Sequence, residues 1–456
     1  MKKIYYIAMI LLAVIGFSSC EKLLEVKPEN LVGIDEGIKT ASDVKAVLMS
    51  TYDVFRNNAV MGGTAKVAAD VLAEEAYASS TGFEWGQIKT LNMNLFNPVG
   101  RDIWQQSYLT ITRANVVIDY IDNNKVPIEP ADAKVWKAEA QFIRAVCYYH
   151  LLQYFSLPYD QTQATNSQPG VPIWTKAVLD NEFASTKVPR SSVEDVYNFL
   201  ITDLLEAEAN LPDDAPGNGR VSKYGAIGFL AKVYFQMNNM QKAFEYSDKV
   251  VVSGKFSLDP NWNDKYASAS LGNATGELVY CIGSSSKNDN SGDGLIGAYR
   301  TDKNDPPGFG PNSTLAAQLS EYATDVRATQ LTDKAGANNI PGLYSTKYNY
   351  EYMIGLVICY NEILLIHAES GLATTQGDPT ADLNAIQLRA GVPTTAATPG
   401  NILKERRKEL ALEGSYFFDL KRVRSNNIHG ESWNSSKLIF QIPDIEQNGN
   451  PDIVLN

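Results

Sequence analysis

The sequence predicts an all-α dominated protein, a scaffold of tetratricopeptide-like helix pairs that carries long loops and a few short strands. Of its 456 residues, 44% are hydrophobic and 20% are charged, which is the composition of an ordinary globular protein. Apolar residues recur at spacings of three and four through most of the chain, which is the period of a buried helix face. Two long stretches interrupt this pattern and are predicted to be loops: the first is rich in Gly, Asn and aromatic residues, and the second in Gly, Asn, Asp and Pro.

Capping residues and apolar periodicity predict the helices of the N-terminal half. The first three predicted helices are one capped by Ser42 or Asp43, one near 65–78 and one capped by Asp102. The next is 133–155, and it is followed by a helix that is capped by Ser191 or Ser192 and runs to about 210. The last two are 222–237 and 241–252. The stretches at 79–98 and 156–189 between them are predicted to be loops.

The last two of these helices carry the tetratricopeptide pattern most clearly. Leu230 and Ala231 are followed by Tyr234, and the next helix carries Ala243. Small residues let two antiparallel helices approach closely, and the aromatic side chain fills the space between them. Weaker versions of the pattern occur elsewhere in the chain, so a compact superhelical arrangement is predicted rather than a regular solenoid.

The C-terminal half is predicted to be more irregular. Residues 277–283 are apolar and β-branched, which is typical of a strand, and residues 284–312 form the second long loop. Helices are predicted at 380–390 and 401–413, and a strand at 437–442. Loops of this length are uncommon in compact proteins and are where binding sites tend to lie.

The N-terminus has the features of an export signal. Lys2 and Lys3 precede an apolar run over 4–17, which is too short to span a bilayer, and small residues then lead to Cys20. A Cys at this position fits a bacterial lipobox, in which its thiol is lipidated and it becomes the first mature residue. The alternative is an ordinary signal peptide with an incidental Cys20.

The predicted organisation follows from this signal. Residues 1–19 form a lipoprotein signal peptide and 20–456 form a single domain. Its N-terminal half, about 20–270, carries the tetratricopeptide-like helices. Its C-terminal half, about 271–456, carries long binding loops and the C-terminal helices.

Composition and missing motifs argue against several function classes. The formal net charge of −12 would repel nucleic acid, and three His leave little room for a His-based metal site. His150 and His367 lie within apolar helices and are predicted to be satisfied core residues. The sequence holds no Walker A loop and no H-E-x-x-H, C-x-x-C or G-x-S-x-G motif. We therefore predict no enzyme activity, no cofactor and no metal.

Two motifs in the second loop are interpreted as chance matches. Residues 292–297 fit G-x-G-x-x-G, but they do not lie between a strand and a helix, as a dinucleotide site requires. Residues 289–300 resemble a calcium loop, but its twelfth position is Arg300 instead of a bidentate Glu. A polar surface loop is the preferred interpretation.

The mature chain retains Cys147, Cys281 and Cys359, each within an apolar stretch. We predict that all three are buried free thiols, which behave as small hydrophobic side chains. One disulfide with a third, free thiol is the alternative for an exported protein.

The two long loops have the chemistry of a sugar-binding site. Phe83 and Trp85 lie between Gly82 and Gly86, which lets the backbone present the rings outward. Aromatic faces stack on the apolar faces of sugar rings, and amide or carboxylate groups bind the hydroxyls. The alternative is that both rings anchor the loop to the core. The predicted ligand-binding residues of the two loops are Phe83, Trp85, Asn92, Asp293, Tyr299 and Phe309.

Several segments together, in their order, resemble the SusD/RagB family of Bacteroidetes outer-membrane lipoproteins. Those of the N-terminal half are the lipobox at Cys20, the run Trp104, Tyr108, Arg113-Ala114-Asn115, and Arg144-Ala145. Those of the C-terminal third are Tyr360-Asn361-Glu362, Leu383-Asn384 to Gly391, Glu405-Arg406-Arg407 to Gly414, Phe418-Asp419-Leu420 and Ile442-Pro443. The resemblance covers nearly the whole mature chain.

The resemblance implies a SusD-like fold and a function without catalysis. Members of the family are surface-anchored lids over a TonB-dependent, SusC-like outer-membrane transporter, to which they deliver oligosaccharides. Some members serve peptides instead, so an oligopeptide-capturing lipoprotein is the alternative. A surface hydrolase and a scaffold that binds only proteins are further alternatives. The family builds its binding sites from variable loops, so no binding residue is carried over by motif.

The family segments themselves are interpreted as scaffold. Glu405 with Lys408, and Arg406 with Glu409, are one helical turn apart and are predicted to pair. A Gly is expected to cap each of the two predicted C-terminal helices at its end.

Overall fold

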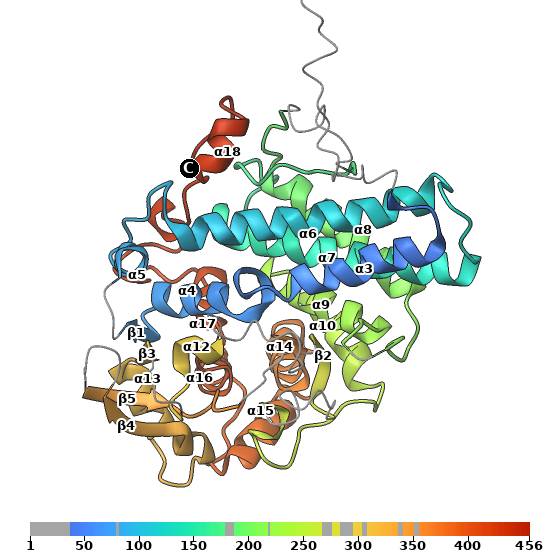
Figure 1. The fold of residues 1–456 in the computed structure, drawn as a ribbon. Helices are drawn as coiled ribbons and strands as arrows, with labels where there is room; N and C mark the ends of the chain where they lie inside the picture. Colours follow the sequence, from blue (N-terminus) through green and yellow to red (C-terminus); the bar gives the residue numbers. More distant parts are fainter. Residues whose placement is uncertain are drawn as a thin grey trace, which may run out of the picture.

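The computed structural model describes residues 37–78, 82–177, 187–217, 219–266, 276–282, 295–302, 308–335, 341–350 and 355–456. Within these residues helices dominate, and the strands form three two-stranded sheets. Long helices cross one side of the molecule, and the short strands gather on the other (Figure 1).

A succession of helices, each packed against the next, forms the frame. In order of packing they are α3 (Ala41–Phe55), α6 (Pro98–Asp122), α7 (Pro130–Phe155), α8 (Val193–Asn210), α9 (Lys223–Gln236), α10 (Met240–Val251), α14 (Tyr360–Thr374) and α15 (Pro379–Ala390). Each helix buries an apolar face between its two neighbours, which is how tetratricopeptide-like arrays build a continuous core. The predicted fold class is therefore confirmed.

The pair α9 and α10 shows why the sequence pattern identified it. Leu230, Ala231 and Ala243 are fully buried where the two helices meet. Tyr234 stacks on Tyr246 of the partner helix, with ring centroids 5.5 Å apart and planes within 18°. The small residues permit close approach and the paired rings fill the remaining space.

The remaining elements cover the ends and inner side of this frame. They are η2 (Asn58–Gly62), α4 (Thr64–Leu72), β1 (Ala76–Ala78), α5 (Phe83–Lys89), β2 (Leu278–Ile282), α12 (Leu295–Tyr299), β3 (Phe309–Pro311), α13 (Ser313–Leu319), η4 (Val326–Gln330), β4 (Leu331–Ala335), β5 (Pro341–Ser345), β6 (Gly355–Cys359), α16 (Pro399–Glu409), α17 (Tyr416–Arg422), η6 (Ser436–Leu438) and α18 (Asp444–Gly449). The antiparallel pairs are β1 with β3, β2 with β6 and β4 with β5.

The first predicted loop was wrong in part, because it contains the short helix α5. The cap of the following helix also differs from the prediction. Asn97, not Asp102, precedes α6, and its side-chain oxygen accepts a hydrogen bond from the N–H of Gly100 at 3.2 Å. Pro98 then occupies the first helical position, where its missing N–H costs nothing.

The predicted strand at 437–442 was wrong. Leu438, Ile439, Phe440 and Ile442 are all buried, and no strand of the described residues pairs with this segment. The ring centroid of Phe440 lies 5.9 Å from that of Phe155 at the end of α7. The backbone N–H of Phe440 donates to the carbonyl of Tyr154. Residues Ser436–Leu438 form the short 3-10 helix η6, and a run of buried apolar residues does not by itself require a ladder of strand hydrogen bonds.

The second predicted loop is also less irregular than expected, since α12 and β3 lie within it. The clear strand prediction at 277–283 is confirmed by β2. The helix at 401–413 is shorter than predicted because α16 ends at Glu409, and α17 and α18 follow it. As predicted, α15 ends at a Gly in left-handed conformation, Gly391, with φ of 73°.

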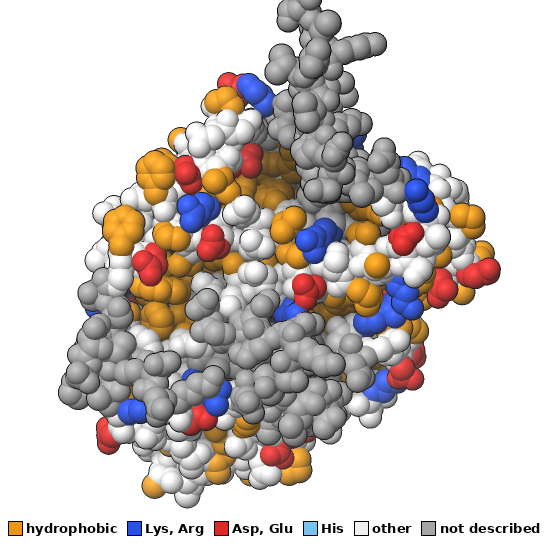
Figure 2. Space-filling view, viewed as in Figure 1, with side chains coloured by type: hydrophobic (Ala, Val, Ile, Leu, Met, Phe, Trp, Pro, Cys, Tyr) orange, Lys and Arg blue, Asp and Glu red, His pale blue; other side chains and the backbone are white. Residues whose placement is uncertain are grey.

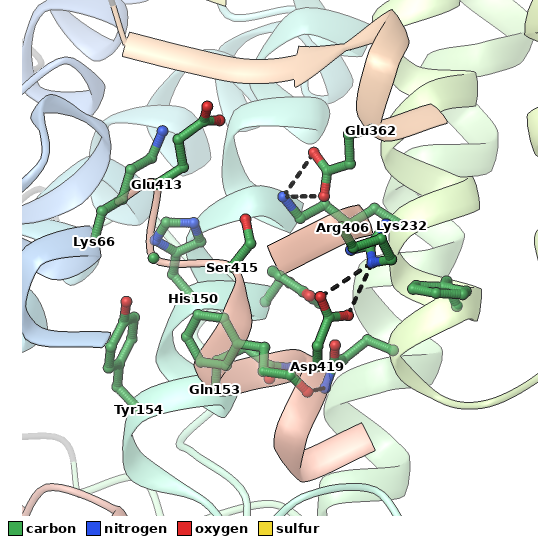
Figure 3. Close-up of a pocket in the computed structure, with 15 residues that line it drawn as sticks. Lys66, His150, Gln153, Tyr154, Lys232, Glu362, Arg406, Glu413, Ser415 and Asp419 are labelled. Carbon is green, nitrogen blue, oxygen red and sulfur yellow. Dashed lines mark hydrogen bonds and ion pairs between the residues drawn. The ribbon is translucent and has the colours of Figure 1, made fainter. Parts of the chain in front are cut away.

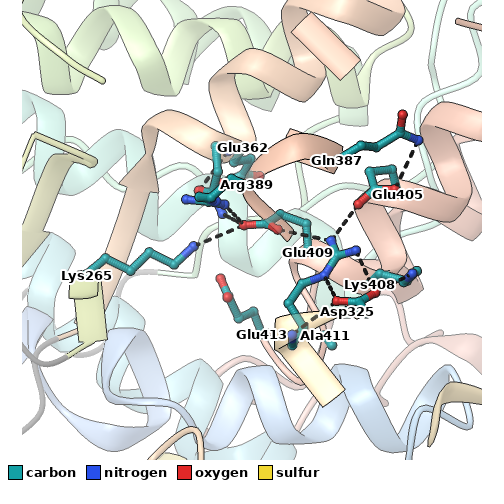
Figure 4. Close-up of polar contacts among 12 residues, drawn as sticks. Lys265, Asp325, Glu362, Gln387, Arg389, Glu405, Lys408, Glu409, Ala411 and Glu413 are labelled. Carbon is teal, nitrogen blue, oxygen red and sulfur yellow. Dashed lines mark hydrogen bonds and ion pairs between the residues drawn. The ribbon is translucent and has the colours of Figure 1, made fainter. Parts of the chain in front are cut away.

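Charged residues of α16 form a buried network with other elements (Figure 4). At its centre, Glu409 accepts a hydrogen bond from Asn361 at 2.7 Å and pairs with Arg389, with Arg327 at 3.2 Å and with Lys265 at 3.7 Å. Burial alone would raise the pKa of Glu409, but these three cations outweigh it and hold the pKa far below its usual range. The carboxylate is therefore ionised in the folded protein.

The predicted pairs within α16 were wrong, although its role as scaffold fits the structure. The partners lie on other elements: Glu405 binds Arg327 at 2.5 Å, Lys408 binds Asp325 at 2.6 Å, and Arg406 binds Asp419 at 3.0 Å. Pairs one turn apart form on a solvated helix surface. Because α16 is buried between neighbours, its charges must instead be neutralised by the elements packed around it.

The prediction of free thiols is confirmed for the three mature cysteines, and the prediction of full burial for two of them. Cys147 and Cys359 are buried, Cys281 is partly buried, and all three are free. Burial raises the pKa of Cys281 to about 12, so its thiol is unreactive at neutral pH.

Folding should therefore not depend on a disulfide. When the mature protein is denatured and alkylated without reductant, we expect Cys147, Cys281 and Cys359 all to be labelled, with mass spectrometry as the measurement. Protection of two of them would show a bridge and contradict the prediction.

Candidate ligand-binding cleft

The short helix α5 separates the two aromatic side chains that the sequence singled out. Positions two apart on a helix lie on nearly opposite sides. Phe83 accordingly points to solvent and is 68% exposed, whereas Trp85 is half-buried. The Trp85 ring packs edge-on against Phe309 of β3, with ring centroids 4.8 Å apart. Residues from the two predicted binding loops therefore meet at this contact.

Trp85 and Phe309 line an open cleft that contains about 1,440 Å³ of empty space. Apolar lining residues come from α4, the start of α6, α12 and β3. In Figure 2, hydrophobic side chains gather in a hollow beside α4, and acidic side chains lie at its rim. The lining residues are Asn57, Asn58, Ala59, Thr64, Val67, Glu84, Trp85, Pro98, Val99, Asp102, Gln106, Gly297, Ala298, Gly308 and Phe309.

Polar side chains surround the two rings. Glu84 and Asp102 offer carboxylates, and Asn57, Asn58 and Gln106 offer amides. Partial burial raises the pKa of Asp102 above its usual range. An aromatic ring with amides and carboxylates around it is suited to a sugar, whose ring faces are apolar and whose edges carry hydroxyls.

Hydrogen bonds hold the first wall of the cleft in place. The side-chain amide of Asn97 donates to the carbonyl of Glu84 at 3.0 Å and to the side chain of Gln87 at 3.1 Å. Because Asn97 also caps α6, one residue fixes α5 against the helix that carries Asp102. Trp85 lies between these two contacts along α5, at the Glu84 backbone and the Gln87 side chain, and is thereby held in position.

The second wall is anchored in the core through Tyr299. Its ring is fully buried beneath Phe309, at 6.2 Å between centroids. Its hydroxyl donates to Asp70 of α4 at 2.9 Å, and the other oxygen of Asp70 accepts from the N–H of Gly414. Burial raises the pKa of Asp70 to about 8. Tyr299 therefore supports the cleft and does not face it.

The structure places the predicted binding residues differently. Trp85 and Phe309 line the cleft, Tyr299 lies beneath it, and Phe83 and Asn92 are exposed outside it. Asp293 and the predicted lipidation site Cys20 lie outside the described residues.

Sequence reasoning missed the contributions of η2 and α6. The sequence did not indicate Asn57 and Asn58 as site residues, because its apolar periodicity does not show that the end of α3 lies beside α5. Asp102 was noticed, but as a helix cap. Its spacing from Gln106, one turn along the same helix, is the signal that could have indicated a shared polar surface.

Two absences hold for the described part of the chain. No group of His, Cys, Asp and Glu side chains there could hold a metal ion. None of the helices in those residues is both long and apolar enough to cross a membrane.

Comparison with known proteins identifies the family. Residues 22–235 match a family described as "Starch-binding associating with outer membrane", and residues 308–451 match the SusD family. The chain belongs to the SusD family. The family's association with the outer membrane and with carbohydrate binding agrees with the resemblance seen in the sequence.

Relatives of this SusD-family chain include proteins of Formosa agariphila. SusD-like protein P2 is 25% identical over 93% of this chain and 91% of its own length. SusD-like protein P38 is 27% identical, but the match covers 58% of this chain and 49% of that relative. The chain thus spans about half the length of some curated relatives that it matches.

Solved structures share the fold. A SusD superfamily protein from Bacteroides thetaiotaomicron superposes with a TM-score of 0.81 at 22% identity, covering 91% of this chain and 99% of that one. A protein described as a laminarin binding SusD-like protein superposes with a TM-score of 0.75 at 23% identity, covering 92% and 99%. Another structure with the same fold, from Bacteroides vulgatus, is described as a "SusD-like carbohydrate binding protein".

Proposed function

We propose that the protein captures oligosaccharides at the cell surface and passes them to a SusC-like, TonB-dependent outer-membrane transporter, without chemically changing them. The observation that carries the proposal is the cleft in which Trp85 and Phe309 meet among carboxylates and amides. The family's description as starch-binding and outer-membrane associated supports the choice of ligand class.

The cleft favours a glycan over a peptide. A groove that binds an extended peptide needs hydrogen bonds to the peptide backbone, and these are commonly supplied by an exposed strand edge. Among the described residues the cleft is lined mainly by helices, and the lining residue that lies in a strand is Phe309, whose strand β3 already pairs with β1. Its rings and side-chain oxygens instead suit hydroxylated rings.

A parallel screen tests the proposed ligand class. The mature protein is applied to a glycan array and to a peptide pool, and retained ligands are confirmed by calorimetry. We expect retention of oligosaccharides and none of peptides. Retention of peptides alone would favour the oligopeptide alternative and contradict the proposal.

We also propose that Cys20 carries the lipid anchor of this protein. Several acyl chains on one residue give stable attachment, at about 0.8 kcal/mol for each buried CH₂ group. Cys20→Ala should therefore release the protein from the membrane fraction or leave its signal uncleaved, as followed by fractionation and mass spectrometry. Unchanged membrane attachment of the variant would rule out this anchor.

A further inference from the structure

A second cavity lies in the interior, apart from the cleft (Figure 3). It contains about 570 Å³ of empty space and forms where α4, α7 and α9 meet α14, α16 and α17. Its walls thus join the two parts of the chain that match family models, and it shares no lining residue with the cleft. The side chains that matter here are those of Lys66, His150, Lys232, Glu362, Arg406, Glu413, Ser415 and Asp419.

Lys66 brings an unneutralised ammonium group to this cavity. Its Nζ donates to the carbonyl oxygen of Leu356 at 2.7 Å, and no carboxylate of the described residues pairs with it. Burial lowers the pKa of Lys66, against the opposing field of Glu413. A buried ammonium is costly unless a counter-charge lies close to it.

Further polar groups face the same space. Nδ1 of His150 is buried and has no partner among the described residues, so the prediction that His150 is a satisfied core residue was wrong. Burial, followed by the fields of Lys232 and Lys66, lowers the pKa of His150 to about 3, so its ring is neutral. Figure 3 places the Ser415 hydroxyl beside the ring, between it and Lys232. Arg406 is 3% exposed, and its Nη1 also lacks a partner in the described part of the chain.

The carboxylates around the cavity are already engaged. Glu362 pairs with Lys232 at 3.0 Å, and Asp419 pairs with Arg406 at 3.0 Å.

Glu413 is bound from its far side. Its carboxylate accepts from Lys347 at 2.7 Å and from Tyr266 at 2.5 Å, and Figure 3 shows it directed away from His150. Burial would raise its pKa, but Lys347 and Lys265 outweigh burial and hold the pKa at about 2. Glu413 therefore forms its ion pair with Lys347, and it acts on Lys66 through its field without a direct ion pair.

We propose that this cavity binds a small monovalent anion, a halide or a short carboxylate, between the Lys66 ammonium and the donors of His150 and Ser415. The anion would neutralise Lys66 and accept hydrogen bonds from the Ser415 hydroxyl and from His150 in the neutral form that carries its proton on Nδ1. It would also link α4 and α7 to the turn before α17, and so fasten the two parts of the chain to each other. This site is independent of the proposed glycan capture.

Bromide locates the site directly. Crystals of the mature protein are soaked in sodium bromide, and we expect an anomalous difference peak in the cavity within hydrogen-bonding distance of Lys66 Nζ. Melting is then measured in sodium chloride, sodium formate and sodium gluconate at equal ionic strength, because gluconate is too large to enter. The melting temperature should be several degrees higher in at least one of the small-anion salts, since a ligand of the folded state stabilises it.

Matched variants separate binding from a purely structural role. Lys66→Met should abolish the bromide peak and the dependence on the anion, whereas Lys134→Met, on the exposed side of α7, should preserve both. If the melting temperature rises in formate alone, the ligand is a short carboxylate. If it rises in chloride as well, the site accepts any small anion.

The proposal is overturned if the wild type shows neither a bromide peak in the cavity nor different melting in the three salts. It is also overturned if Lys66→Met lowers the melting temperature equally in all three, because Lys66 would then act only through Leu356. The bromide soak and the melting curves of the wild type test the proposal even if Lys66→Met fails to fold.

Discussion

Replacing Trp85 with alanine is expected to weaken oligosaccharide binding by at least about 2 kcal/mol, or roughly thirtyfold. The ring is half-buried at the edge of the cleft, where one face can stack on a sugar while its neighbour Phe309 supports it. The variant loses that stacking surface entirely. Calorimetric titration with an oligosaccharide found in the screen provides the measurement.

The same change should cost less in stability than in binding. Trp85 makes one edge-on aromatic contact, of a kind that contributes about 0.5–1.5 kcal/mol beyond buried area. A true core anchor would instead cost roughly 3–5 kcal/mol on truncation to alanine. Phe96→Ala is the matched control, because Phe96 is 61% exposed and lies outside the cleft. If Trp85→Ala loses much stability but keeps its affinity for the oligosaccharide, Trp85 only anchors α5 to the core and does not bind sugar.

Replacing Glu409 with glutamine is expected to destabilise the protein by about 3–5 kcal/mol. The substitution keeps the shape of the side chain but removes the charge that faces Arg389, Arg327 and Lys265, all of them buried. Those cations would be left short of counter-charge in the interior. Chemical denaturation at neutral pH measures the loss.

The control for this change is Glu321→Gln. Glu321 pairs with Lys404 at 2.7 Å, but both side chains are well exposed, so the cost should be about 0–1 kcal/mol. Equal losses for the two variants would mean that the buried network contributes no more than a surface pair.

The pH dependence of the wild type has a defined sign. The folded-state pKa of Glu409 is depressed, as is that of Glu413, which is held at about 2. A depressed pKa stabilises the folded state above the unfolded value, near 4.3 for Glu, and this contribution is lost as the pH falls toward the folded pKa. The difference between wild type and Glu409→Gln should therefore narrow below about pH 4.

Local patterns predicted the frame of the molecule well. The pair α9 and α10 was identified because Leu230, Ala231, Tyr234 and Ala243 occupy positions whose spacing reports contact between neighbouring helices. Such contacts are short-range in sequence, so periodicity and side-chain size carry enough information. The burial of Cys147 followed in the same way from its apolar surroundings.

Contacts between distant segments were not predictable in the same way. The partners of Arg406 and Glu409 are set by how α16 packs against α14, α15 and α17, and no spacing within α16 records that packing. The cleft is similar, since Asn57 and Gln106 reach it only because η2, α5 and α6 converge. Aromatic chemistry indicated Trp85 and Phe309, but it could not separate them from Tyr299, whose hydroxyl is bound to Asp70 in the interior.

A crystal structure of the mature protein with an oligosaccharide found in the screen tests glycan capture most directly. We predict a sugar ring stacked on Trp85, with its hydroxyls bound by the side chains of Glu84, Asp102 or Gln106. A sugar bound away from the cleft, with Trp85 and Phe309 uncovered, would contradict the account.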